Sequence, residues 1–176
     1  LPLLDIKPTL AYKLNDYISV GGGLDIYTFA SFLGEGQGEF QQNIGSTLEA
    51  NGKDTALGFN ASLLLTPIRN EAGKPLLNFG FVYRNGADLK LDGDFLANGA
   101  KVAEARTTVE LPDIYTWAFA AWPIRNVRHE WKIEVDVEYA DWTDFKDLDL
   151  HLSDFKNPAL PPGFTQTISQ PRNYRD

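Results

Sequence analysis

The sequence of 176 residues contains no cysteine and no methionine, and it has only two histidines. The absence of cysteine excludes disulfide bonds, thiolate metal ligands and a thiol nucleophile. The histidines, His129 and His151, lie in different segments, so neither a shared metal site nor a catalytic triad is indicated. We therefore expect neither a metal nor another cofactor.

Long apolar runs and basic clusters are also missing. No run reaches the roughly 18 apolar residues of a membrane-spanning helix, which excludes such a helix. With 16 lysine and arginine residues against 24 aspartate and glutamate residues, the formal net charge is -8. Because phosphate binding requires clustered basic side chains, we expect no nucleic-acid partner. These averages alone describe an ordinary acidic soluble domain.

The sequence does contain a regular alternation of apolar and polar residues. Residues 131–139 alternate apolar with charged side chains, and in residues 77–91 the odd positions are mostly apolar. This period of two predicts β-strands with one apolar and one charged face. The same pattern, with less contrast, occupies residues 4–13, 18–32, 57–65 and 115–120. We therefore predict an all-β, antiparallel fold with about six strands and no helix.

Strand length and loop length favour a membrane barrel. Several runs extend over about 13–17 residues, whereas soluble strands usually have ~5–6 and membrane-spanning strands ~9–11. Short connections at residues 15–16, 68–74 and 125–128 alternate with long ones at residues 33–53, 93–106 and 153–175. Bacterial outer-membrane barrels sort their turns in this way. Because an open sheet would expose unpaired backbone groups to lipid, we expect partner strands beyond these six.

In such a barrel the apolar face meets lipid and the charged face lines the lumen. The expected lipid-facing residues are Trp131, Ile133, Val135, Val137, Tyr139, Leu77, Phe79 and Phe81. The expected lumen-facing residues are Lys132, Glu134, Asp136, Glu138, Arg84, Asp88 and Lys90.

Nothing in the sequence indicates catalysis, so we expect no enzymatic activity. Residues 21–23 are three glycines, but no helix start and no Lys-Ser/Thr pair follows them as in a phosphate-binding loop. An acidic group near the end of the chain matches neither a calcium loop nor a fixed catalytic pair, and a solvated strand extension explains it. That group consists of Asp141, Asp144, Asp147 and Asp149.

Apolar residues in two long loops are candidate ligand contacts. In the first loop they are spaced about four apart, which suggests a short amphipathic turn. The candidates are Phe40, Ile44, Leu48, Phe95, Leu96 and Val102. These side chains either capture a hydrophobic molecule or pin the loops to each other. Pro8 and Pro112 each remove a hydrogen-bond donor from a strand, which marks either a bulge or a local opening of the wall.

Several blocks of the chain resemble the FadL family of outer-membrane transporters for long-chain fatty acids and hydrocarbons. They are LAYKLNDYISVGGGLDI (10–26), GFNASLLLTPI (58–68), NFGFVYRNGADLKLDGD (78–94), VELPDIYTWAFAAWPIR (109–125) and WKIEVDVEYADWTDFKDLDL (131–150). The most specific pieces are LPD at residues 111–113 and YADWTDF at residues 139–145.

The resemblance implies an outer-membrane barrel of about fourteen strands, of which residues 1–176 form a single middle segment. We expect the amino-terminal hatch and the closing strands of the family to lie outside this segment. It also implies passive uptake of hydrophobic small molecules, with long-chain fatty acids as the first expectation. The substrate would bind among the outer loops and diffuse sideways through the wall. The expected partners are that molecule, outer-membrane lipid and lipopolysaccharide, and the oligomeric state stays open.

A soluble alternative fits the same alternation. In a lipocalin-like barrel or sandwich, the apolar face would point inward around an apolar ligand and the charged face would meet water.

Overall fold

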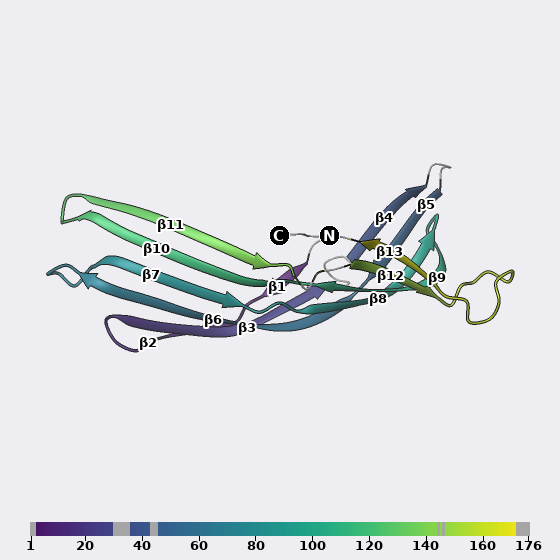
Figure 1. Ribbon diagram of the computed structural model, residues 1–176, viewed down its shortest axis with the longest axis horizontal. Helices are drawn as coiled ribbons and strands as arrows, with labels where there is room; N and C mark the ends of the chain where they lie inside the picture. The colour runs from purple at the N-terminus through teal and green to yellow at the C-terminus, as the bar shows by residue number, and fades with distance from the viewer. Residues whose placement is uncertain (1–2, 30–35, 43–45, 144, 146, 172–176) are drawn as a thin grey trace.

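The computed structural model describes residues 3–29, 36–42, 46–143, 145 and 147–171, and it is built from strands (Figure 1). They are β1 (Leu4–Ile6), β2 (Thr9–Lys13), β3 (Ile18–Phe29), β4 (Gly36–Gln42), β5 (Ser46–Gly52), β6 (Asp54–Arg69), β7 (Pro75–Arg84), β8 (Asp88–Ala97), β9 (Ala100–Glu110), β10 (Asp113–Arg125), β11 (Glu130–Asp141), β12 (Asp147–Ser153) and β13 (Gln166–Pro171). Among the described residues, no helix is long and apolar enough to cross a membrane.

The longest strands form one antiparallel sheet, called the wall here, in the order β1-β3-β6-β7-β10-β11. β2 also pairs with β3, at Thr9↔Gly23, beside the β1 pairing at Ile6↔Ile26. β1 and β2 therefore occupy one strand position, interrupted at Pro8, which has no N–H to donate. Seven strands in six positions match the predicted number of six.

The remaining strands form the outer sheet, in the order β13-β12-β9-β8-β5-β4. Here the sequence-based expectation of long loops is wrong for residues 33–53 and 93–106. β4 and β5 pair with Phe40 opposite Leu48, so the expected amphipathic turn is also wrong, and Ile44 lies outside the described residues. β8 and β9 are joined at Asn98 and Gly99, whose φ values of 51° and 80° suit a tight hairpin. β5 gains its stability by pairing with the distant β8, a contact that no local pattern reveals.

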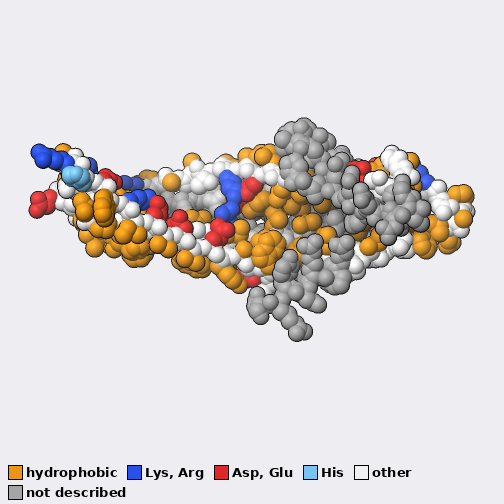
Figure 2. All heavy atoms as spheres, turned by 90° about the horizontal axis from the view of Figure 1, so that it is seen from above, with side chains coloured by type: hydrophobic (Ala, Val, Ile, Leu, Met, Phe, Trp, Pro, Cys, Tyr) orange, Lys and Arg blue, Asp and Glu red, His pale blue; other side chains and the backbone are white. Residues whose placement is uncertain are grey.

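The wall has one apolar and one polar face. Strand register places Phe81, Trp117 and Val137 in one row and Phe79, Phe119 and Val135 in the next. Most of these side chains are exposed, as are Trp131, Ile133 and Tyr139. Figure 2 shows hydrophobic side chains along one side of the wall and charged side chains along the other. The expected lipid-facing residues thus share one exposed face.

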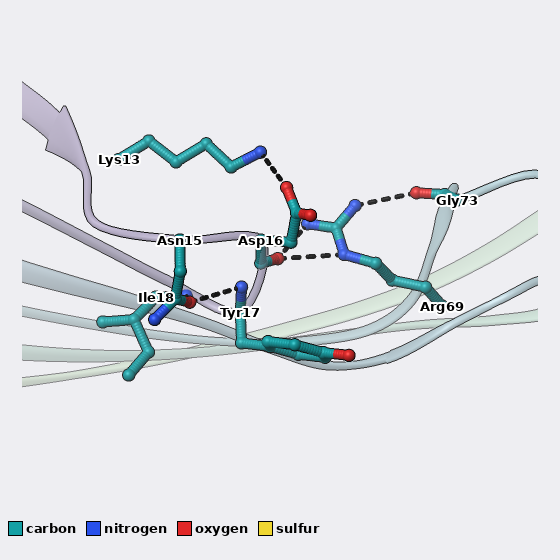
Figure 3. A network of polar contacts seen from close by, with 7 residues as sticks. All are labelled: Lys13, Asn15, Asp16, Tyr17, Ile18, Arg69 and Gly73. Atoms are coloured by element: carbon teal, nitrogen blue, oxygen red, sulfur yellow. Dashed lines mark hydrogen bonds and ion pairs between the residues drawn. The ribbon is translucent and has the colours of Figure 1, made fainter.

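The turns at one end of the wall are joined by Arg69 (Figure 3). Its Nε donates a hydrogen bond to the backbone oxygen of Asp16 at 2.9 Å, its Nη2 donates to the same oxygen, and its Nη1 donates to that of Gly73 at 2.7 Å. Lys13 lies 2.5 Å from the Asp16 carboxylate, and this hydrogen bond lowers the pKa of Asp16 below its ordinary value. One arginine therefore ties the β2–β3 turn to the β6–β7 turn.

The buried apolar cluster lies in the outer sheet. Phe95, Ala103, Ala105 and Leu152 form its centre. Partly buried residues pack around it, namely Leu48, Ala50, Val102, Leu150 and Phe155. The wall is too thin to have a core of its own, since a single sheet must meet its surroundings on both faces.

Candidate functional site

Two strand breaks lie side by side between the wall and the outer sheet. One is residues 85–87, between β7 and β8, and the other is residues 111–112, between β9 and β10. The Leu111 N–H donates to the Ala87 oxygen at 2.9 Å, and the Gly86 N–H donates to Oδ1 of Asp113 at 2.6 Å. A Cβ on Gly86 would lie only 2.0 Å from the Leu111 oxygen, so only glycine fits there. These contacts hold the two breaks together, and residues 85–87 and 111–113 are called the joint between the two sheets from here on.

The apolar face of the wall and the apolar face of the outer sheet lie on opposite sides of the molecule, and the change of side occurs at this joint. In β7 the odd-numbered Phe79 belongs to the exposed apolar face of the wall. In β8 the odd-numbered Leu91 faces β5, because a Cβ on Gly52 would lie 3.0 Å from the Leu91 Cβ. The odd-numbered Phe95 likewise lies opposite Ala50.

The continuous segment of β5 and β6 shows on which side of the wall the apolar face of the outer sheet continues. Residues 46–69 run from the outer sheet into the wall, and Lys53 keeps the pairing by bridging to Asp92. Because side chains alternate along a strand, Ala50 and Gly52 lie on the same side as Asn60. Asn60 belongs to the polar face of the wall, where its Nδ2 donates to Asp25 at 2.8 Å. The apolar face of the outer sheet therefore continues the polar face of the wall.

The structure brings together three of the residues expected to contact a ligand. Leu48 and Val102 pack on the buried Phe95 in the apolar cluster of the outer sheet. Leu96 lies opposite Glu49 and Lys101, on the other face. Phe40 is described by its backbone alone, and Ile44 lies outside the described residues.

Sequence reasoning missed Leu152 and Phe155, which belong to the same cluster. Leu152 is 2% exposed, and it follows Leu148 and Leu150 at a spacing of two, which is the spacing of side chains on one face of a strand. Phe155 opens the connection between β12 and β13 and packs on the cluster. Its ring meets that of Phe164 at 5.4 Å, edge to face, so this connection covers part of the apolar cluster.

The polar face of the wall carries ion pairs and one fully buried carboxylate. Arg84 lies 3.8 Å from Glu138, and Lys132 lies 2.5 Å from Glu134. Asp25 is 0% exposed. Its Oδ1 accepts from Asn60, while its Oδ2 is buried without a hydrogen-bond partner among the described residues.

The expected lumen-facing residues divide at the joint. Arg84 and the residues of β11 share the polar face of the wall. Asp88 and Lys90 do not, because they follow the break at residues 85–87 and lie on the charged face of the outer sheet, with Asp92 and Arg106. For Asp88 and Lys90 the expectation is wrong, because the chain changes sides while its alternation continues.

A third break, at Pro8, lies against three glycines of β3. A Cβ on Gly23 would lie 2.3 Å from the Pro8 oxygen, and the Leu24 N–H donates to that oxygen at 3.2 Å. On the apolar face of the wall, Gly22 pairs with Ala61. β3 therefore adds no side chains at residues 21–23, and Ser62 Oγ and the Pro8 oxygen lie where Cβ atoms on Gly21 and Gly23 would be.

The acidic group near residues 141–149 forms no metal site in the described residues. Asp141 accepts hydrogen bonds from the backbone and hydroxyl of Thr143 at 3.1 and 2.5 Å. Asp144 and the side chain of Asp147 lie outside the description. His129 lies in the turn between β10 and β11 of the wall, and His151 lies in β12 of the outer sheet. The His151 Nδ1 is 3.0 Å from the Thr167 hydroxyl.

The fold and family follow from comparison with known proteins. The toluene transporter TbuX of Ralstonia pickettii matches with a TM-score of 0.62 at 15% identity, over 98% of this chain and 48% of that one. The chain thus spans about half the length of TbuX and shares its fold. No curated protein matches the chain in sequence.

A family model described as outer membrane protein transport protein (OMPP1/FadL/TodX) matches residues 1–176. This is a family of transporters rather than enzymes, and the match disfavours the soluble lipocalin-like alternative. The chain belongs to the OMPP1/FadL/TodX family of outer-membrane transport proteins.

Proposed function

We propose that the protein takes up hydrophobic small molecules across the outer membrane. The observation that carries this proposal is the reversal of sides at the joint. Below it, apolar side chains point away from the lumen, as lipid requires; above it, they point to the lumenal side, where they line the mouth. An outer sheet whose charged face meets water and whose apolar face lines the entrance to the lumen suits capture of a hydrophobic molecule at the cell surface.

The proposed binding site is the apolar face of the outer sheet. Leu48, Phe95 and Val102 lie there, and Leu91 continues the face toward the wall. Lipopolysaccharide and membrane lipid would surround the wall without taking part in binding. The toluene named for TbuX and the long-chain fatty acids expected from the sequence both have the apolar body that such a face recognises.

The proposed exit is sideways through the wall at residues 21–23. The glycines add no side chains to β3 there, and Pro8 interrupts the neighbouring strand beside Gly23. A hydrophobic molecule that leaves by this route enters the membrane without crossing water.

Uptake by a deletion strain that expresses the full-length gene tests the proposal. We expect Leu91→Gln, on the apolar face, to reduce the initial uptake of radiolabelled toluene severalfold. The matched control is Lys90→Gln, on the opposite face, which should leave uptake unchanged. Heat-modifiable migration in gels shows that both variants fold. Equal uptake by the two variants would refute the proposed site. Uptake by the strain without the gene equal to that of the strain with the unaltered gene would refute the proposed function.

A further inference from the structure

We infer that Asn98, at the tip of the β8–β9 hairpin, is a site of spontaneous deamidation, in which the backbone nitrogen of Gly99 attacks the asparagine side chain. The inference goes beyond the transport function and does not depend on it. The sequence contains three Asn-Gly pairs, at residues 51–52, 85–86 and 98–99. A glycine at the second position favours the reaction, because it has no Cβ to shield its backbone nitrogen.

The reaction uses only the protein chain and water. The glycine nitrogen loses its proton and bonds to Cγ of the asparagine, and the Cγ–Nδ2 bond breaks to release ammonia. Water then opens the cyclic imide at one of its two carbonyl carbons. One opening gives aspartate. The other gives isoaspartate, in which the main chain runs through the former side chain and is one methylene longer.

The hydrogen bonds to the asparagine side chains do not distinguish the three pairs. In each pair the asparagine Oδ1 accepts a hydrogen bond from a backbone N–H of another strand. The donors are Asp94 at 2.9 Å for Asn51, Phe59 at 2.6 Å for Asn85 and Thr47 at 3.0 Å for Asn98. Since all three amide carbonyls are polarised in this way, a difference in reactivity must come from the glycines.

Gly99 is free to attack. Asn98 and Gly99 are both exposed, and no atom lies within 4 Å of the place where a Cβ on Gly99 would be. The Gly99 N–H donates no hydrogen bond to a described residue. Attack requires the turn to open for a moment, and the tip of a hairpin opens at low cost. The pair at residues 98–99 therefore has both the space and the motion that the reaction needs.

Gly86 is held in the joint. Its N–H donates to Oδ1 of Asp113 at 2.6 Å, and its oxygen accepts a hydrogen bond from Nδ2 of Asn85 at 2.8 Å. The Leu111 oxygen presses against the same glycine, only 2.0 Å from where a Cβ would be. Attack on Asn85 would break the bond to Asp113 and separate the two strand breaks, so the fold protects this pair.

Gly52 is held inside a strand. It is buried within β5, where it lies opposite Gly36 of β4, and a Cβ on it would lie 3.0 Å from the Leu91 Cβ. The pair at residues 51–52 can react only when β5 leaves its neighbours. Opening of paired strands costs more than fraying of a turn, so this pair is protected as well.

Isoaspartate at position 98 would release one end of β5. The Asn98 N–H donates to the Thr47 oxygen at 2.9 Å, and Asn98 Oδ1 accepts from the Thr47 N–H. These two bonds extend the pairing of β5 with β8 beyond Leu48↔Ala97. The added methylene displaces both groups of residue 98, whereas aspartate keeps an acceptor oxygen in the same place.

Ageing of the purified full-length protein tests the inference. The folded protein in detergent would be kept at mildly alkaline pH, digested with trypsin and analysed by mass spectrometry. Cleavage after Lys53, Arg84, Lys90 and Lys101 places the three pairs in separate peptides. We expect conversion at residue 98 to be faster than in the other two pairs by about tenfold or more, which corresponds to about 1.4 kcal/mol in the barrier. In urea, where all three glycines are free, the rates should be similar.

Two variants test the protection of Asn85. Asp113→Ala frees the Gly86 N–H and should raise conversion at Asn85 severalfold in the molecules that fold. Tyr83→Phe is the matched control, because it removes only the other hydrogen bond to the same carboxylate, and it should leave conversion at Asn85 unchanged.

Hydrogen exchange tests the consequence for β5. The Thr47 amide should exchange faster in aged protein that contains isoaspartate, and at the original rate in Asn98→Asp.

Conversion at Asn51 or Asn85 as fast as at Asn98 in the folded protein would overturn the inference. So would a folded protein in which Asn98 stays intact while the protein in urea reacts. An unchanged rate at Asn85 in folded Asp113→Ala would overturn the protection assigned to the bond between Gly86 and Asp113.

Discussion

The hydroxyl of Tyr83 donates a hydrogen bond to Oδ2 of Asp113 at 2.8 Å, linking the end of β7 to the start of β10 where the wall meets the outer sheet. The other oxygen of the same carboxylate accepts from the Gly86 N–H. One side chain therefore fixes the end of β7 and the break that follows it. Without these bonds, the change of sides at this level would depend on backbone pairing alone.

Removing this carboxylate should destabilise the folded protein. Asp113→Ala loses both hydrogen bonds, and Tyr83→Phe loses one, worth about 1.5–3 kcal/mol for a charged acceptor. We expect the unfolding temperature in a gel-shift assay to fall for Tyr83→Phe and to fall further for Asp113→Ala. Tyr139→Phe is the control, because the Tyr139 hydroxyl has no hydrogen-bond partner among the described residues. A loss for Tyr139→Phe as large as that for Tyr83→Phe would contradict the assignment.

Gly86 should tolerate no side chain. Gly86→Ala places a Cβ 2.0 Å from the Leu111 oxygen, so the two breaks must separate. We expect a large loss of folded protein in the outer membrane, measured as the heat-modifiable fraction. Gly163→Ala is the comparison, because its φ of 77° costs only about 1 kcal/mol and its surroundings are open. Equal folded fractions of the two variants would show that the close approach is not required.

The turn that Arg69 holds should lose stability in acid. The pKa of Asp16 is lowered mainly by its hydrogen bond with Lys13, so Asp16 is charged more readily in the folded protein than in the unfolded chain. Its contribution is present above the unfolded pKa and is lost as the pH falls through the lowered folded value. The difference in unfolding temperature between the protein and Asp16→Asn should therefore shrink below about pH 4. A difference that stays constant from neutral pH to pH ~3 would exclude this linkage.

Phe155 should hold the β12–β13 connection against the outer sheet. Phe155→Ala removes a partly buried ring, at a cost of roughly 1–3 kcal/mol, and leaves the hydrogen bond from the Lys156 N–H to the Val102 oxygen at 2.8 Å. We expect faster cleavage within residues 157–163 by a protease, with the wall still resistant. Phe164→Ala loses the ring contact but not the packing on the cluster, so its effect should be smaller. Unchanged cleavage of Phe155→Ala would contradict this role.

The strands of the wall could be predicted from the sequence because one face of the wall carries apolar side chains and the other carries polar ones. Residues 131–139 alternate strictly for this reason, and β11 follows that alternation. The outer sheet was less predictable, because β5 owes its place to β8, which lies far along the chain. The polar, glycine-rich residues around β4 have low strand propensity and look like a loop.

The reversal at the joint could not be read from the sequence at all. Odd positions are apolar from Leu77 to Tyr83 and again from Ala87 to Leu91, while the break at residues 85–87 turns the chain to the other side. A period of two shows that apolar and polar side chains alternate, but it does not show toward which side of the sheet the apolar ones point. The same limit explains the candidate residues, since Phe95 and Leu96 are neighbours in sequence and lie on opposite faces.

Residues 46–69 have a mechanical consequence. Both neighbouring connections between the sheets are broken, at residues 85–87 and 111–112, whereas this segment passes through with its pairing intact at Lys53. We expect this segment to be stiffer than the two broken connections, so that a tilt of the outer sheet would twist β6. Because β6 pairs with β3 from Asp54↔Phe29 onward, that torsion would enter the wall at Phe29 and run along β3 toward Gly22.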